Sequence, residues 1–111
     1  MTINSRAKGC RGERELAELL RVRGHDARRG QQFSGGADSP DVVCATLPGI
    51  HLECKRVERG NLYDWLDQAI RDAGAKVPVV AHRRNGREWT AILPLADLLD
   101  LLEKANGRHS D

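Results

Sequence analysis

The segment from residue 50 to residue 57, IHLECKRV, largely alternates apolar and polar side chains. On an extended strand alternate side chains share a face, so Glu53 and Lys55 point the same way, while Leu52 and Cys54 point the other way into a core. A charged face backed by an apolar face is typical of an edge strand. The segment therefore predicts a β-strand that carries an acid and a lysine side by side.

The flanking residues predict further strands and helices. Residues 61–73 predict a helix, because apolar side chains recur at helical spacing between Leu62 and Ala73. The other expected elements are a helix over 8–23, a short strand over 26–29, a strand over 41–45, strands over 77–82 and 88–93 joined by a turn at Asn85-Gly86, and a helix over 95–104. This order predicts an α/β fold, with a mixed central β-sheet flanked by helices.

The helix expected over 8–23 has an apolar stripe formed by Leu16, Leu19 and Leu20. Gly9 and Gly12 fall on the same face, one and two turns earlier. Because glycine has no side chain, the start of this helix is expected to pack closely against its neighbours.

Size and composition predict a single domain over residues 1–111. No apolar run reaches the roughly 20 residues needed to cross a bilayer, and the first residues, MTINSRAKG, lack a secretion signal. Three scattered cysteines, Cys10, Cys44 and Cys54, predict free thiols in a reducing cytosol. No CxxC or HxxxH pair is present, so zinc is not expected. A cytoplasmic protein with no membrane partner is the expectation.

The charge of the chain is unevenly distributed. The net charge is only +2, but residues 1–36 carry eight Lys and Arg residues against four acids. A second basic cluster, residues 83–87 (RRNGR), is expected in a turn. Basic patches on a nearly neutral chain are typical of a protein that binds a polyanion with one face. A solvated helix face plus a charged hairpin is the alternative explanation.

Two acids and a lysine form the candidate catalytic group. Cleavage of a phosphodiester with a metal needs carboxylates that hold Mg²⁺ or Mn²⁺, a nucleophilic water, and positive charge to offset that of the phosphate. Asp41 and Glu53 can supply the carboxylates, Lys55 can orient the water or stabilise the transition state, and the carbonyl of Cys54 could add a metal ligand. Asp38, in the preceding loop, could replace Asp41. Alternatively, Asp41 only caps a strand, and Glu53 and Lys55 form an exposed ion pair worth under about 1 kcal/mol.

A series of short motifs surrounds this group in a fixed order. They are residues 8–16 (KGCRGEREL), Arg28-Arg29, residues 34–36 (SGG), Pro40-Asp41 and residues 52–55 (LECK). In this order they resemble the PD-(D/E)xK nuclease superfamily, and within it the archaeal-type Holliday junction resolvases and their small phage relatives. In that family a KGxxxERxL helix start precedes an arginine, a Ser/Gly-rich loop, an aspartate and an ExK strand. The resemblance covers about residues 7–82 and implies a restriction-endonuclease-like core.

The resemblance implies roles for individual residues. Asp41 and Glu53 would bind the metal, Lys55 would assist catalysis, and Glu13 would complete the acidic site. Residues expected to contact DNA are Lys8, Arg14, Arg28, Arg29, Ser34, Tyr63 and Gln68. The loop over residues 30–40 is expected to become ordered on a bound ligand.

Simpler interpretations exist for several of these residues. Glu13 could be a first-turn acid favoured by the helix dipole, and Arg14 could be solvated. Trp65 has the spacing of a core residue, whereas Tyr63 lies off that stripe. His51 shares the face of Glu53 and Lys55 and could be a neighbour of the site.

The expected function is a Mg²⁺- or Mn²⁺-dependent DNA endonuclease that acts on branched DNA, in particular a four-way junction. Alternatives are a nuclease for flaps, nicks or duplex DNA, and a DNA-binding module without turnover. A four-way junction has two scissile strands and each chain offers one metal site, so a homodimer is expected.

Overall fold

The computed structural model describes residues 5–30 and 40–107. Its elements are α1 (Ser5–Val22), β1 (Ala27–Arg29), β2 (Val42–Cys44), β3 (Ile50–Lys55), α2 (Leu62–Ala73), β4 (Val77–His82), β5 (Thr90–Ile92) and α3 (Leu95–Ala105). The expected order of elements is confirmed. Ser34 and Asp38 lie outside the described residues, and so does the loop expected over 30–40 except for Gly30 and Pro40. The N–H of Gly30 donates to the carbonyl of Asp41, just beyond the loop, at 2.8 Å.

The described strands form one mixed sheet in the order β1-β2-β3-β4-β5. β3 pairs with β2 in antiparallel and with β4 in parallel orientation, and the two outer pairs are antiparallel. The expectation that residues 50–57 form an edge strand is therefore wrong. β3 is central because β4 returns beside it after α2, and a central strand has neighbours on both sides that bury its polar residues as well.

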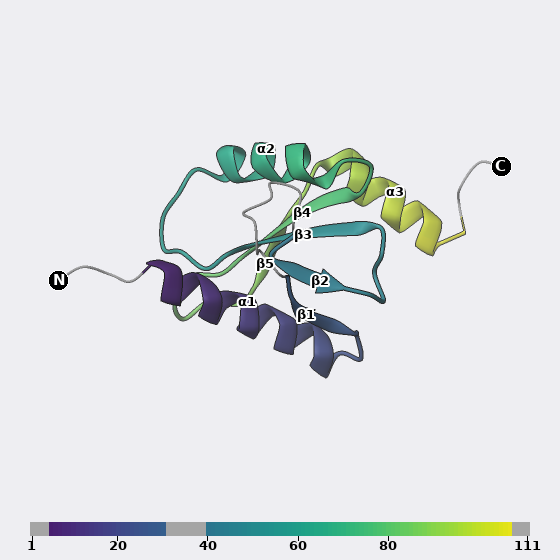
Figure 1. The fold of residues 1–111 in the computed structure, drawn as a ribbon. Coiled ribbons are helices and arrows are strands. Elements are labelled where there is room, and N and C mark those ends of the chain that lie inside the picture. Colours follow the sequence, from purple (N-terminus) through teal and green to yellow (C-terminus); the bar gives the residue numbers. More distant parts are fainter. Residues whose placement is uncertain (1–4, 31–39, 108–111) are drawn as a thin grey trace.

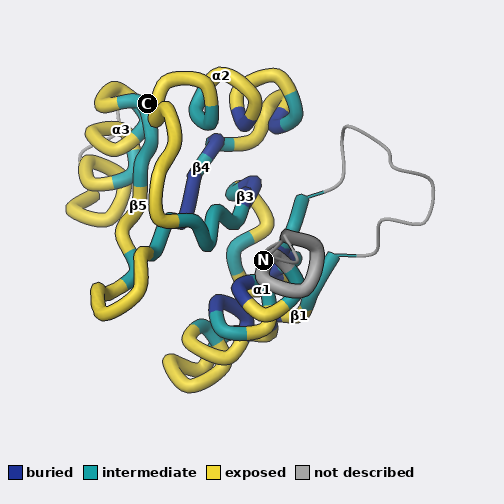
Figure 2. The backbone as a smooth tube through the Cα atoms, turned by 90° about the vertical axis from the view of Figure 1, so that its left-hand side faces the viewer, coloured by how far each residue is buried: buried dark blue, intermediate teal, exposed yellow. Residues whose placement is uncertain are grey.

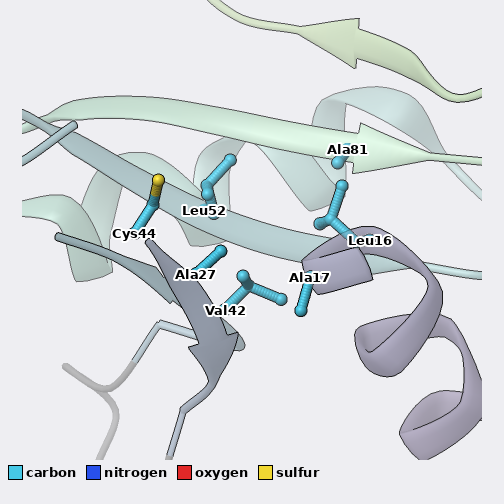
Figure 3. Close-up of a cluster of buried hydrophobic side chains, with 7 residues drawn as sticks. All are labelled: Leu16, Ala17, Ala27, Val42, Cys44, Leu52 and Ala81. Carbon is cyan, nitrogen blue, oxygen red and sulfur yellow. The ribbon is translucent and has the colours of Figure 1, made fainter. Parts of the chain in front are cut away.

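Helices cover both faces of this sheet. α1 packs against β1, β2 and β3, and α2 packs against β3 and β4 from the opposite side (Figure 1). The core under α1 consists of Leu16, Ala17, Ala27, Val42, Cys44, Leu52 and Ala81 (Figure 3). The alternation of β3 thus places Leu52 toward α1 and its neighbour Glu53 toward α2.

The packing of α1 confirms the close approach expected at Gly12 and corrects the expected apolar stripe, while the surroundings of Gly9 lie outside the described part of the chain. A Cβ added at Gly12 would collide with Cβ of Arg56, so the missing side chain lets the helix approach the end of β3. Leu16 is buried, but Leu19 is 39% exposed. Ala17, which is fully buried, takes the place expected for Leu19, because the sheet contacts a strip of the helix centred between Leu16 and Ala17.

α2 begins and ends as its sequence predicts. The side chain of Asn61 accepts hydrogen bonds from the N–H groups of Tyr63 and Asp64, which caps the helix. Gly74 follows the last turn with φ of +60°, which glycine adopts without strain. Ala69 and Ala73 are the helix residues buried against the sheet.

The last hairpin joins β4 to β5. The strand pair nearest the turn is His82 with Thr90. β5 (Thr90–Ile92) is therefore shorter than the strand expected over 88–93, and the connection between the two strands is longer than expected. The loop is closed internally, because the N–H of Arg87 donates to the carbonyl of Arg84 at 3.2 Å and Nε of Arg83 donates to the carbonyl of Arg87 at 2.6 Å. Gly86 has φ of +72°, as expected for the glycine of the turn.

α3 is the least buried helix of the described chain. None of its residues is buried, and the tube of α3 is exposed along most of its length (Figure 2). Four of its leucines, Leu95, Leu98, Leu99 and Leu102, are between 37% and 67% exposed. Among the described helices none has the length and apolar character that a membrane span requires.

Candidate active site

The antiparallel pairing of β2 with β3 brings Asp41 beside Glu53. Val42 pairs with Leu52, and the N–H of Asp41 donates to the carbonyl of Leu52 at 3.0 Å. The N–H of Cys54 then donates to Oδ2 of Asp41 at 2.8 Å. The carboxylate of Asp41 is therefore held against the main chain of the ExK segment.

Glu53 is buried, which excludes the interpretation as an exposed ion pair. Its exposed fraction is 4% and that of His51 is 2%. Nε2 of His51 lies 2.8 Å from Oε1 of Glu53. A carboxyl group held so deeply must have polar partners, because an isolated buried charge is costly.

The surroundings of Glu53 favour its protonated form. Burial, and after it the negative charge and hydrogen bond of Asp41, raise the pKa of Glu53 to about 8 from an ordinary 4.5. Asp72 adds to this rise, and the ammonium of Lys55 opposes it. The two acids and the lysine named from the sequence therefore act on one another electrostatically.

Asp72 of α2 is an acid of this site that was not predicted from the sequence. One ligand atom from each of His51, Glu53 and Asp72 lies within 4.8 Å of the others. Asp72 follows the buried Ala69 by three residues, so it lies on the same side of the helix. That spacing was the signal that could have identified it.

Glu13 reaches the site from α1. Nε of Arg29 donates to Oε1 of Glu13 at 3.1 Å, and the same guanidinium contacts Sγ of Cys10 at 3.1 Å. Burial raises the pKa of Glu13, the hydrogen bond from Arg29 lowers it, and the charge of Asp41 raises it further. Glu13 is thus close enough to Asp41 for their charges to interact.

The residues expected to contact DNA differ in how far they are exposed to solvent. Arg14, Arg28, Tyr63 and Gln68 are exposed, and Arg29 is partly buried by its pairing with Glu13. Lys8 lies in α1, but its side chain is outside the described part of the chain, as is Ser34. The structure brings together Glu13, Asp41, Glu53 and Lys55, and it leaves the DNA contacts as predictions.

Arg56, after β3, and Arg83, in the basic cluster 83–87, are held by an acid of α1. The side chain of Arg56 is only 11% exposed, and its Nε lies 3.1 Å from Oε1 of Glu15. Arg83 pairs with the same oxygen at 3.2 Å. Glu15 thus joins α1, the end of β3 and the hairpin, and Arg56 has a structural role.

A divalent cation fits the chemistry of the acidic group. Asp41 and Glu53 are hard oxygen donors of the kind that Mg²⁺ and Mn²⁺ prefer. Their mutual repulsion contributes to the raised pKa of Glu53, and a cation between them would remove it. A second donor set, His51, Glu53 and Asp72, shares Glu53 and lies beneath α2.

A mixed sheet with Asp41, the ExK strand and a helix glutamate at one site defines a nuclease of the PD-(D/E)xK type. The family model described as archaeal Holliday junction resolvase (Hjc) matches residues 4–107. The chain therefore belongs to the archaeal Holliday junction resolvase family, and it is a resolvase-like nuclease.

A solved structure supports the same assignment. The chain resembles Hjc of Archaeoglobus fulgidus, a Holliday junction resolvase from an archaeal hyperthermophile, with 26% sequence identity and a TM-score of 0.57. The similarity covers 78% of this chain and 72% of that chain. No curated protein matches the sequence.

Proposed function

We propose that the protein is a Mg²⁺- or Mn²⁺-dependent endonuclease that cuts four-way DNA junctions. The observation that carries this proposal is the buried carboxyl of Glu53, held beside Asp41 on a strand that also carries Lys55. A non-catalytic DNA-binding protein would gain nothing from acids held together where phosphates bind. We also infer a single nuclease domain over residues 1–111 that acts inside the cell, since the family model spans residues 4–107 and the three cysteines are free.

Asp41 and Glu53 are the proposed metal ligands, and the carbonyl of Cys54 is a third. When bound, the cation would activate a water and offset negative charge on the scissile phosphate. The hydrogen bond from the N–H of Cys54 fixes the position of Asp41 before the cation arrives. His51, at 2.8 Å from Glu53, limits the rotation of that carboxylate in the same way.

Lys55 is proposed to act in the transition state. Its ammonium interacts with the charge of Glu53, so it lies where a phosphate held at the acidic site would contact it. A fixed positive charge that meets developing negative charge lowers the barrier without reorganisation. Glu13, paired with Arg29, completes the acidic group from the side of α1.

DNA contacts are proposed around this site. Lys8, Arg14, Arg28, Arg29, Ser34, Tyr63 and Gln68 remain the proposed set. Arg14 and Arg28 support it best, since both are exposed and lie on elements adjoining Glu13 and Arg29. Basic side chains there would neutralise phosphates on either side of the cut.

We also propose a homodimer, formed through the exposed apolar surface of α2 and α3. Leu62 and Leu66 of α2 line a groove together with Leu93 and Leu95. The exposed leucines of α3 and Ile70 of α2 add to this surface. Monomeric proteins rarely expose large apolar patches, and a junction with two scissile strands requires two sites. A second copy of the chain meets both requirements.

The experiment that tests the proposed function uses matched four-way, flap and linear duplex DNAs of equal strand length. Paired cuts on opposite strands of the junction, dependent on Mg²⁺ and absent from the duplex, are the expected result. Cutting of the flap or the duplex at the same rate would assign the protein to general nuclease activity. No cutting of any substrate with Mg²⁺ or Mn²⁺ would exclude the proposed activity.

A further inference from the structure

A hollow of about 420 Å³ opens beside the C-terminal ends of the parallel strands β3 and β4. We call it the Trp65 pocket. Its wall includes Trp65 of α2 and His82 at the end of β4, together with Arg59, Arg84 and Arg87. Its volume lies within the roughly 300–1,000 Å³ typical of sites for small ligands. None of these residues belongs to the proposed metal site.

The aromatic wall of the pocket is fixed in place. The ring centroids of Trp65 and His82 are 4.8 Å apart, with an angle of 49° between their planes. Nε2 of His82 lies 2.9 Å from the carbonyl oxygen of Val57, which holds the imidazole in one orientation. A Cβ added at Gly60 would collide with the indole of Trp65, so the main chain itself packs against that ring.

The arginines of the pocket differ from those that support the fold. Arg56 and Arg83 pair with Glu15. Among the described residues, by contrast, the guanidinium groups of Arg59, Arg84 and Arg87 make no hydrogen bond or ion pair. They are free to take an anion.

The acids of the pocket do not cancel this charge. Glu58 accepts a hydrogen bond from the N–H of Asn85 at 2.8 Å and lies 3.7 Å from Arg56, so its carboxylate is already engaged. Glu88 is the other acid of the lining, against three arginines. The pocket thus combines flat aromatic rings with an excess of guanidinium groups, which is the chemistry that binds a base and its phosphate.

The pocket also lies next to the proposed catalytic strand. Lys55 pairs with His82 across β3 and β4, and the N–H of Arg83 donates to the carbonyl of Lys55 at 3.1 Å. The main chain that carries the pocket is therefore bonded directly to the strand that carries Lys55. A DNA strand with its scissile phosphate at Lys55 would run past the opening.

We propose that the Trp65 pocket holds one unstacked nucleotide of the bound DNA strand, close to the scissile phosphate. This inference rests on the proposed function as a DNA nuclease. At a junction the bases beside the branch point can leave their stack at lower cost than those within a continuous duplex. Occupation of the pocket would therefore favour branched over linear DNA.

The test uses four-way junctions that each carry one abasic site, moved nucleotide by nucleotide across the cut. Affinity is measured in EDTA, so it does not depend on cleavage. At one position near the cut, loss of the base should weaken binding by the wild type about tenfold, as loss of one base–aromatic stack does. In Trp65→Leu the intact junction should bind about tenfold more weakly, with no further loss at that position. Trp65→Phe should keep most of the effect.

Matched charge variants separate the pocket from general attraction to DNA. Arg84→Gln combined with Arg87→Gln should weaken binding and reduce the abasic effect. Arg23→Gln combined with Lys76→Gln removes the same charge from two exposed residues outside the pocket, one after α1 and one before β4, and should leave the abasic effect unchanged. Thermal unfolding of each variant checks that the fold is retained.

Two results would overturn the proposal. One is the absence of any abasic position that weakens binding by the wild type, including the case in which a free deoxynucleoside monophosphate binds tightly and Trp65→Leu abolishes that binding. The other is an equal abasic effect in the wild type and Trp65→Leu. Failure of the proposed nuclease function is recognised separately, as absence of cleavage of the intact junction with Mg²⁺.

Discussion

Asp41 accepts a 2.8 Å hydrogen bond from the main-chain N–H of Cys54, the residue between Glu53 and Lys55. Asp41, just before β2, is thus anchored to the main chain of β3. The position of its carboxylate depends on the pairing of β2 with β3 and not on contact with another side chain. The consequence is a pair of carboxyl groups, Asp41 and Glu53, that the fold forces together.

The stability of the metal-free protein should fall as pH rises. Burial and Asp41 raise the pKa of Glu53 to about 8, so the folded chain holds a proton that the unfolded chain releases near its ordinary pKa of 4.5. Stability contributed by that proton is fully present below the unfolded pKa and is lost as pH rises through the folded one. The melting temperature in EDTA should therefore decrease between about pH 5 and about pH 8.5. Glu53→Gln, which cannot ionise, should show a smaller decrease.

Added metal should reverse that loss. A cation held by Asp41 and Glu53 would displace the proton of Glu53, so Mg²⁺ or Mn²⁺ should raise the melting temperature more at about pH 8.5 than at about pH 6. Asp41→Asn should remove most of this stabilisation. Equal stabilisation of Asp41→Asn and the wild type, with loss in Asp72→Asn instead, would place the ion with His51, Glu53 and Asp72.

Replacement of Lys55 should slow cleavage without loss of binding. Lys55→Ala removes a charge that is proposed to act in the transition state, and the single-turnover rate should fall by about 100-fold or more. Lys55→Arg should restore only part of it, since a planar guanidinium presents its donors differently from an ammonium. Junction affinity in EDTA should change by less than about threefold, because most of the proposed phosphate contacts belong to other basic residues. A large loss of affinity with an unchanged rate on bound DNA would make Lys55 a phosphate anchor only.

Gly12→Ala should destabilise the fold although alanine favours helices. The new methyl group would collide with Cβ of Arg56, so α1 must shift away from the end of β3 at a cost of about 1–3 kcal/mol. Gly49→Ala is the control, since a Cβ there meets no atom within 4 Å. Its effect should stay within about 0.5 kcal/mol. Equal urea midpoints for the two variants would contradict the close packing assigned to Gly12.

Leu98→Glu should disrupt the proposed dimer. A charge on the exposed face of α3 cannot be buried against a second copy, so light scattering should detect monomers, and paired cuts should become single nicks. Val22→Glu changes a residue that is 76% exposed on α1 and should leave the mass unchanged. A wild type that is already monomeric, or a Leu98→Glu variant that remains dimeric, would refute this interface.

Much of the fold could be predicted because its signals are local. The helical spacing from Leu62 to Ala73 and the alternation of IHLECKRV each identify an element without reference to the rest of the chain. The central position of β3 is not local, since it depends on the parallel pairing with β4. The same limit hid Asp72, whose place beside Glu53 is decided by the side of α2 that faces the sheet.

Solvent exposure was predicted least well. Leu19 carries the spacing of a core residue but lies on the margin of the strip that contacts the sheet, and Arg56 looks like a surface cation but is enclosed by α1. Periodicity indicates which face of a helix or strand is apolar. How much of that face is buried depends on the elements packed against it, and those cannot be identified from the periodicity. Pairing of Arg56 with Glu15, 41 residues away in the chain, has no signature in the sequence.

Strand cleavage and binding of one four-way junction, measured for the wild type and Asp41→Asn, test whether Asp41 and Glu53 form the metal site of a junction nuclease. We expect paired cuts by the wild type with Mg²⁺, no cuts in EDTA, and loss of cutting in Asp41→Asn with junction affinity equal to or tighter than that of the wild type. Full cleavage by Asp41→Asn, or cleavage by the wild type in excess EDTA, would contradict that assignment.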